Sequence, residues 1–226
     1  MLTSVNLDRE RQILDAAAAL FYEKGFHGVG VDEIGQSVGI SGPALYRHFA
    51  GKDEILATLF NEAIEELIGA TAAVYTDPHR DLERLVRHHV KFAVDHRHLV
   101  NVYQREERPL AQPWRQHFQR RMRHYASRWE EALRRCFPDA SPEQIAAGAQ
   151  AAIGMIHSVA NWPRAARNTA DLPDLLHRLV THGLAALEAG GRADSTDEGS
   201  AGDAAQRESA NASVVRPRRS GRTKAA

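Results

Sequence analysis

One stretch constrains the fold of this chain more than any other: residues 39–52, which read GISGPALYRHFAGK. Gly39 suits the left-handed turn that joins two short helices at a steep angle. Ser41 can cap the following helix, because its hydroxyl can accept a hydrogen bond from an unpaired backbone N–H. Pro43 falls in the first turn of that helix, where its missing N–H costs nothing. The stretch therefore predicts a sharp turn followed by a helix that begins near Ser41.

Residue spacing divides this helix into an inner and an outer face. Leu45 and Phe49 lie four residues apart and are expected to face the interior. Pro43, Tyr46 and Arg47 lie three and four residues apart and are expected to face outward. A short helix with a small, polar N-terminus and an aromatic and basic outer face fits the major groove of DNA.

A second short helix is predicted just upstream. Val31, Ile34 and Val38 form an apolar stripe at helical spacing. Ile40 can fill the angle between the two helices. Two helices joined at Gly39 are typical of a helix-turn-helix, in which the first helix braces the second and the second reads DNA.

These residues closely resemble the tetracycline-repressor-type (TetR) family of bacterial regulators, and the resemblance covers residues 9–56. An Ala-rich helix that ends in Phe21 and Gly25 precedes the helix-turn-helix, and Lys52 follows it. Gly35 stands where the family usually has Ala. It is expected to loosen the bracing helix by up to about 1 kcal/mol.

The resemblance implies an all-α fold with two domains. An N-terminal three-helix helix-turn-helix DNA-binding domain is expected at residues 1–52. A C-terminal helical ligand-binding and dimerisation domain is expected at residues 53–189. From residue 190 the composition shifts to Gly, Ser, Ala, Asp and Arg without periodicity, so residues 190–226 are predicted to be a disordered tail.

Apolar residues recur at helical spacing through both domains. The first helix is expected at residues 8–24, after a loose arm at residues 1–7. Further helices are predicted at residues 53–75, 81–96, 99–106, 113–137, 141–162 and 172–189. The last two are rich in apolar and small residues, which fits a four-helix dimer seam that includes Ile153. The resemblance likewise implies a homodimer formed by the last two long helices.

The resemblance also carries over a set of DNA contacts by position. Gly42 and Ala44 can read bases only through backbone or methyl contacts. Tyr46, His48 and Lys52 are expected mainly to hold phosphates. The full set expected for a double-stranded, near-palindromic operator is Ser41, Gly42, Pro43, Ala44, Tyr46, Arg47, His48 and Lys52.

Large apolar side chains in the second domain predict a cavity for a small, mostly apolar effector. The candidates are Phe92, Tyr103, Phe118, Met122, Met155 and Trp162, each of which is also compatible with ordinary core packing. A loose likeness to TetR-type regulators of lipid metabolism favours a fatty acid or an acyl-thioester. Arg120 and Arg121 are the first cations to test against a phosphate-bearing head group. The remaining arginines of residues 113–137 are interpreted as a solvated face.

Composition excludes several other classes of protein and limits how the chain can bind DNA. The chain has 29 Lys and Arg against 29 Asp and Glu, so DNA affinity must come from a few placed cations and from two copies in a dimer. The one cysteine, Cys136, excludes an internal disulfide and a Cys-based zinc site. The richest apolar run, residues 145–159, is interrupted by Gln150 and His157, so we expect no membrane span and a cytoplasmic location.

No catalytic or metal-binding constellation is evident in the sequence. The densest histidines lack the paired spacing that metalloproteases use and are interpreted as a helix-loop surface; they are His88, His89, His96 and His98. No G-x-S-x-G or S-x-x-K nucleophile motif occurs. We therefore expect no enzyme activity, no cofactor and no metal.

The sequence thus predicts a ligand-responsive transcriptional regulator, and specifically a repressor that an effector releases from its operator. The helix over residues 53–75 is expected to transmit effector binding to the reading helices. The alternative is a small-molecule-binding helical protein without operator-specific DNA binding.

Overall fold

The computed structural model describes residues 2–106, 110 and 112–190, and these residues form helices and no strand. The predicted all-α fold is therefore confirmed. Within this described part, no helix is long and apolar enough to cross a membrane. The elements in chain order are α1 (Leu2–Lys24), α2 (Val31–Ser37), α3 (Gly42–Leu45), α4 (Lys52–Thr71), α5 (Pro78–Asp95), α6 (Arg97–Glu106), α7 (Trp114–Cys136), α8 (Pro142–Ser158), the 3-10 helix η1 (Val159–Asn161), α9 (Arg164–Arg167), α10 (Leu172–Leu184) and α11 (Ala186–Gly190).

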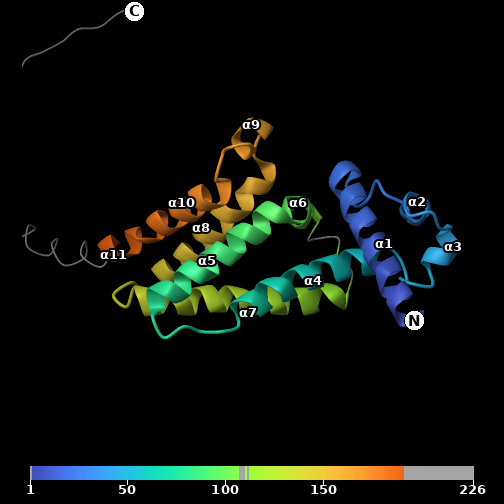
Figure 1. Ribbon diagram of the computed structural model, residues 1–226. Helices are drawn as coiled ribbons and strands as arrows, with labels where there is room; N and C mark the ends of the chain where they lie inside the picture. The colour runs from blue at the N-terminus through green and yellow to red at the C-terminus, as the bar shows by residue number, and fades with distance from the viewer. Residues whose placement is uncertain (1, 107–109, 111, 191–226) are drawn as a thin grey trace, which may run out of the picture.

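Helices α1, α2 and α3 form a small head at one end of the molecule, and α4 leads from the head into the body (Figure 1). Each of the three helices of the head contributes a fully buried apolar side chain to its packing. Ile13, Ile34 and Leu45 are fully buried in one core cluster, as the helical spacing predicts. Helix α4 is anchored in the head at its start, because it packs against α1 and the Lys52 ammonium donates hydrogen bonds to the carbonyls of Phe26 and Val29.

The body consists mainly of α4, α5, α7, α8 and α10. Helix α7 packs along α4 and also contacts α5 and α8, while α10 covers α5 and α8 (Figure 1). Tyr125 and Trp129 of α7 are among the largest fully buried side chains, and aromatic rings of this size dominate the packing energy of a core. Because α4 packs against α1 in the head and against α5 and α7 in the body, it is a direct mechanical connection between the two.

The first and last helices differ from the prediction. Helix α1 begins at Leu2, so residues 2–7 are helical rather than a loose arm, since nothing in that stretch breaks a helix. Helix α8 ends at Ser158 and tightens into η1, and α9, which was not predicted, follows. Helix α10 ends at Leu184, before the short α11. Most of the predicted tail, residues 191–226, lies outside the described residues.

Helix α4 ends at Thr71 and not near Tyr75 as predicted. The reason is a side chain from the next helix. The Arg84 guanidinium donates hydrogen bonds to the carbonyls of Ala70, Thr71 and Ala73. These carbonyls would otherwise need further helical N–H groups, so a tertiary contact stops the helix.

A buried carboxylate organises the same corner of the body. Asp81 is 0% exposed, and its Oδ2 accepts hydrogen bonds from Arg128 (2.6 Å) and Arg135 (3.0 Å) of α7. Its Oδ1 accepts one from the Tyr75 N–H at 3.2 Å. The prediction of a solvated arginine face on α7 is therefore wrong for Arg128 and Arg135, which turn inward to pair with this carboxylate.

The predicted seam face of α8 is also wrong. Ala149, Ala152 and Ile156 are buried within the protomer itself, because they pack against other helices of the same body. The outer surface of α8 and α10 instead carries Met155, 39% exposed, and Leu179, 47% exposed. The apolar stripe of α8 thus packs inside the protomer, and only exposed apolar side chains such as Met155 and Leu179 are available for an interface.

Candidate DNA-reading surface and effector cavity

The turn between α2 and α3 has the geometry that the sequence predicts. Gly39 has a φ of 71°, in the left-handed region that favours glycine. The Ser41 hydroxyl accepts a hydrogen bond from the Ala44 N–H at 3.3 Å and so caps α3. Gly35 has a packing role that the prediction missed. A Cβ there would lie 3.0 Å from the carbonyl oxygen of Ile40, so the glycine lets α2 approach the turn closely.

Four of the predicted DNA contacts lie on the outer surface of this motif. Ser41, Pro43 and Arg47 are exposed, and Tyr46 is 56% exposed. Their common exposure follows from the burial of Leu45, which fixes the opposite face of α3 against the head core. This surface is free to approach a DNA groove.

Three other predicted contacts are less accessible. Gly42 is buried and Ala44 is half-buried, so any base contact there uses the chain itself or a methyl group. His48 is half-buried, and its Nδ1 lies 3.7 Å from a carboxylate oxygen of Glu10 in α1. The imidazole therefore faces α1 as well as the outer surface.

Lys52 holds the loop between α1 and α2. Its ammonium donates hydrogen bonds to the carbonyls of Phe26 (3.0 Å) and Val29 (2.9 Å). It also lies 4.6 Å from the centroid of the Phe26 ring, within the range of a cation–π interaction. Because an ammonium has three N–H donors, only one remains for the phosphate that the sequence predicts.

We expect Tyr46→Ala to weaken DNA binding without unfolding the head, because the side chain is 56% exposed. Loss of one phosphate hydrogen bond costs about 1 kcal/mol, or roughly fivefold in affinity. The factor should be the same for operator and for random DNA, since a phosphate contact carries no sequence information. Fluorescence anisotropy with both DNAs measures it. Tyr75→Ala, at a 49% exposed tyrosine of the body, is the control. A changed base preference with unchanged affinity for random DNA would contradict the phosphate role.

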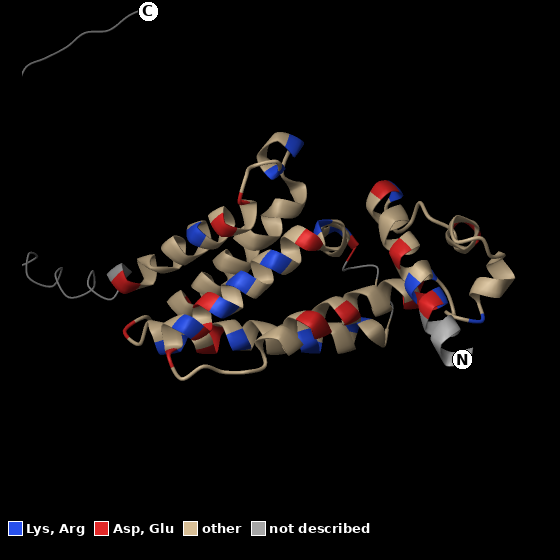
Figure 2. Cartoon of the chain, viewed as in Figure 1, with Lys and Arg blue, Asp and Glu red and all other residues tan. Residues whose placement is uncertain are grey.

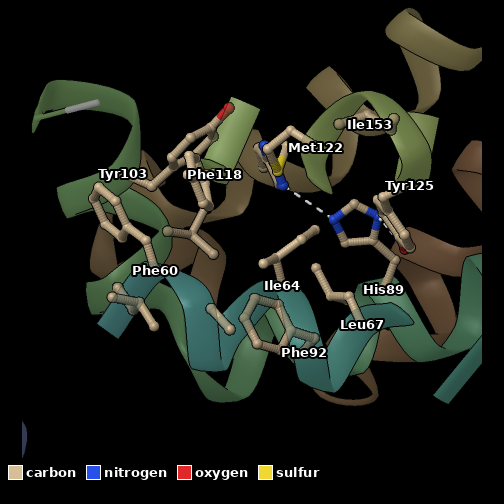
Figure 3. A pocket seen from close by; sticks show the side chains of 14 residues that line it. Phe60, Ile64, Leu67, His89, Phe92, Tyr103, Phe118, Met122, Tyr125 and Ile153 are labelled. Carbon is tan, nitrogen blue, oxygen red and sulfur yellow. Dashed lines mark hydrogen bonds between the residues drawn. The ribbon is translucent and has the colours of Figure 1, made fainter. Parts of the chain in front are cut away.

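The second candidate site is an apolar cavity lined by residues of α4, α5, α6, α7 and α8 (Figure 3). The cavity volume is about 40 Å³, which corresponds to roughly three water molecules. An effector of ordinary size therefore enters only if the surrounding helices move apart. Its wall includes Phe60, Ile64, Leu67, Phe92, Tyr103, Phe118, Met122 and Ile153.

The cavity includes part of the predicted lining. Phe92, Tyr103, Phe118 and Met122 line it, whereas Met155 and Trp162 do not. Met155 lies on the outer surface of α8, and the Trp162 indole N–H donates to the Ser158 hydroxyl at 3.0 Å. The prediction was wrong for these two because Ile153, rather than Met155, marks the inner face of α8.

The two cations predicted for a head group lie elsewhere. Arg121 forms an ion pair of 2.6 Å with Glu65 on α4, and Arg120 is exposed. Among the described residues, no Lys, Arg, Asp or Glu lines the apolar cavity. No group of three or more His, Cys, Asp or Glu side chains that could hold a metal occurs in the same part of the chain.

A hydrogen-bonded chain of three polar side chains also lines the cavity. The Nε2 atoms of His89 and His157 lie 3.0 Å apart, and the Tyr125 hydroxyl lies 3.2 Å from Nδ1 of His89 (Figure 3). Burial and the neighbouring His157 hold the pKa of His89 well below its usual value, and burial lowers the pKa of His157 to about 4. Both rings are neutral at pH 7, so one Nε2 carries a hydrogen and donates it to the other.

His89 shows where the sequence interpretation failed. It was assigned to a helix-loop surface but is buried in the body. Its position contains a usable signal, because it lies four residues after Leu85, three after Val86 and four before Ala93, all of them buried. Helical periodicity therefore places it on the inner stripe. No comparable signal identifies its partner His157, which lies 68 residues away.

Helix α6 connects the cavity to the head by a second route. Leu99, Val100 and Tyr103 of α6 line the cavity. At the end of the same helix, the buried carboxylate of Glu106 accepts a hydrogen bond from the Phe26 N–H at 3.2 Å. A displacement of α6 would therefore shift the loop that precedes α2, because this hydrogen bond joins the two.

Comparison with protein-family models gives matches over both parts of the chain. Residues 13–59 match the family described as bacterial regulatory proteins, tetR family. Residues 75–187 match the family described as the tetracyclin repressor-like C-terminal domain. The first match covers most of the head and the start of α4, and the second covers α5, α6, α7 and α8, which line the cavity together with α4.

Individual proteins show the same similarity. The HTH-type transcriptional activator FasR of Mycolicibacterium smegmatis is 36% identical over 61 residues, which cover 27% of this chain and 28% of FasR. The HTH-type transcriptional repressor KstR2 of Mycobacterium tuberculosis is 30% identical over 129 residues, which cover 55% of this chain and 64% of KstR2. The chain thus matches less than two thirds of either relative. The structure of AibR in complex with isovaleryl coenzyme A and operator DNA has the same fold, with a TM-score of 0.66 and 21% identity over 77% of this chain and 97% of that chain.

Proposed function

The chain belongs to the TetR family of bacterial regulators, and we propose that it is a repressor that binds a near-palindromic operator as a homodimer and leaves it when a small effector binds. A ligand-responsive, DNA-binding regulator is what the family and its relatives support. The repressor role, the dimer and the class of effector form the proposal.

The observation that carries the proposal is the double anchorage of α4. At its start, Lys52 is hydrogen-bonded to the carbonyls of Phe26 and Val29 in the head. Further along the same helix, Phe60, Ile64 and Leu67 line the cavity. An effector larger than the cavity of about 40 Å³ must displace this wall. Displacement of α4 tilts the head, and in a dimer it changes the separation of the two α3 helices, so that they no longer fit both half-sites.

The cavity favours an effector with an apolar body and a neutral oxygen. A free carboxylate would be buried there without a cation, which is costly, whereas a thioester carbonyl or a hydroxyl can pair with the neutral His89–His157 chain. Of the two predicted classes, the acyl-thioester therefore fits better than the free fatty acid. The isovaleryl coenzyme A in the AibR structure supports the same choice.

We expect His157→Leu to weaken binding of a medium-chain acyl-thioester about tenfold, because one buried hydrogen bond of about 1.4 kcal/mol is lost. Operator binding without effector should not change, since His157 lies in the body and not on α3. Calorimetry and gel shift measure the two affinities. His124→Leu, at an exposed histidine of α7, is the control. Equal effector affinity in the two variants would show that the histidine pair does not contact the ligand.

Gel shift with DNA from upstream of the protein's own gene tests the function itself. Specific binding that a thioester weakens is the expected result. If the effector weakens operator binding by a certain factor, the operator must weaken effector binding by the same factor, because the two affinities are thermodynamically linked. A ligand that binds equally well with and without operator is not the inducer, however tightly it binds. Effector binding without any specific DNA complex would favour the alternative, a helical binding protein that has no operator.

A further inference from the structure

A second hollow lies where the end of α5, the start of α6, η1, α9 and the start of α10 meet. Its volume is about 470 Å³, against about 40 Å³ for the apolar cavity. Its wall combines apolar side chains with a basic set, and Figure 2 shows Lys or Arg positions on both α6 and α9. The lining residues are Val94, Val159 and Leu172 together with Arg97, Arg164, Arg167 and Asn168.

Among the side chains that the structure describes, residues 8–106, 110 and 112–188, none forms a hydrogen bond or an ion pair with the guanidinium groups of the three arginines of this hollow. The Nε atoms of Arg97 and Arg167 are shielded from water and meet no acceptor in that part of the chain. Shielded N–H groups of a charged side chain are costly to leave unpaired. The half-buried Arg128 and Arg135 at the other corner of the body do have a partner, because they share the carboxylate of Asp81, although Nη1 of Arg128 also meets no acceptor. The hollow therefore has donors and positive charge, and none of its described lining residues is an Asp or a Glu.

The positive field of these arginines reaches a neighbouring side chain. Burial lowers the pKa of His98 first, and the charges of Arg97 and Arg167 lower it further, while Glu23 opposes them. His98 stacks on Tyr22 of α1 at a centroid distance of 4.1 Å. The charges from α6 and α9 thus act together on the same side of the body, without a lining carboxylate to neutralise them.

We propose that this hollow binds the phosphate or pyrophosphate group of a small molecule. The guanidinium group is a planar fork that donates two parallel hydrogen bonds to phosphate oxygens, and three such groups around one space suit more than one negative charge. Asn168 adds an amide donor at the rim. These residues, rather than the predicted Arg120 and Arg121, are the cations placed to receive a phosphate-bearing head group.

Two sources of the phosphate group are compatible with this position. Helix α6 contributes Arg97 to the hollow and Leu99 and Val100 to the apolar cavity. A coenzyme A thioester can therefore place its acyl part in the cavity and its phosphates in the hollow, which is an extension of the proposed function. The other source is a phosphorylated molecule that binds the hollow alone, and this does not depend on the identity of the effector.

The first test is calorimetry of the full chain with inorganic pyrophosphate at low ionic strength, where charge interactions are least screened. We expect Arg167→Gln to weaken binding at least tenfold. It should also raise the Tm of the unliganded protein by about 1–3 °C, because it relieves repulsion between like charges. Arg134→Gln is the control, since Arg134 is exposed and pairs with Glu130 and Glu131. No pyrophosphate binding by the unmodified protein, or equal losses in the two variants, would overturn the proposal.

The second test separates the sources with octanoyl coenzyme A and octanoate. A loss of at least tenfold for the thioester but not for octanoate in Arg167→Gln assigns the hollow to the effector's phosphates. A loss for pyrophosphate with unchanged thioester affinity assigns it to an independent anion. Arg167→Gln should retain operator binding in both cases, and operator binding by the unmodified protein is measured separately. The hypothesis of an anion site and the hypothesis of a regulator function can therefore be rejected independently of one another.

Discussion

Asp81→Ala is expected to destabilise the protein by about 3–5 kcal/mol, the usual cost of removing one partner of a buried ion pair. The change leaves the half-buried guanidinium groups of Arg128 and Arg135 without their carboxylate, with only backbone carbonyls as the remaining partners in their hydrogen bonds. It also removes the acceptor for the Tyr75 N–H. The loop that follows α4 is therefore expected to loosen together with the α5–α7 contact.

Urea unfolding, followed by the circular dichroism of the helices, measures this loss. Asp174→Ala is the matched control, because Asp174 forms an exposed ion pair of 3.2 Å with Arg87. Exposed pairs of this kind contribute about 0–1 kcal/mol. If the two variants lose the same stability, the buried carboxylate is not what holds the corner of α4, α5 and α7 together.

The pH dependence of stability gives an independent check on Asp81. Burial opposes ionisation, but the hydrogen bonds from Arg128 and the Tyr75 N–H and the charges of Arg128 and Arg135 outweigh it and lower the pKa of Asp81. A carboxyl group with a folded pKa below its unfolded value of about 3.9 stabilises the protein above that value. This contribution is lost as the pH falls through the folded pKa. Asp81→Asn should flatten the acid limb of the stability curve.

Leu179→Asp is expected to convert the proposed dimer into a folded monomer. Leu179 is 47% exposed on α10 and lies on the outer surface that also carries Met155 of α8, so an aspartate there leaves the protomer core intact. In a dimer seam, however, it would bury an unpaired charge. Light scattering measures the mass, and circular dichroism confirms that the helices remain.

The effect on DNA binding should be larger than that of any single contact on α3. Two linked heads gain an effective concentration that raises affinity by about 10²–10⁴ over one head, so the monomer should bind operator at least 100-fold more weakly. Val74→Asp, at a 62% exposed valine outside α8 and α10, is the control. Ile153→Asp is unsuitable, because Ile153 lines the cavity and its replacement would disturb the core in any case. A dimer that survives Leu179→Asp would place the seam elsewhere.

Local spacing was sufficient to predict the reading motif. Gly39, Ser41 and Leu45 specify a left-handed turn, a capped helix start and an inward face within seven residues. All of these depend on neighbours in sequence, so no knowledge of distant contacts was needed. The same is true of the existence of the long helices, whose apolar periodicity is visible without a partner.

Tertiary structure alone decided how the inward-facing residues pair. The carboxylate of Asp81 meets arginines 47 and 54 residues away, and His89 meets His157 across 68 residues. A helical period shows which face a side chain occupies but not which helix will cover it. Charged and polar residues on a buried stripe therefore look like solvated ones until the packing is known. For the same reason the sequence placed Met155 in the cavity and Ile153 in the seam, whereas packing of α8 against its neighbours puts Ile153 at the cavity and leaves Met155 exposed.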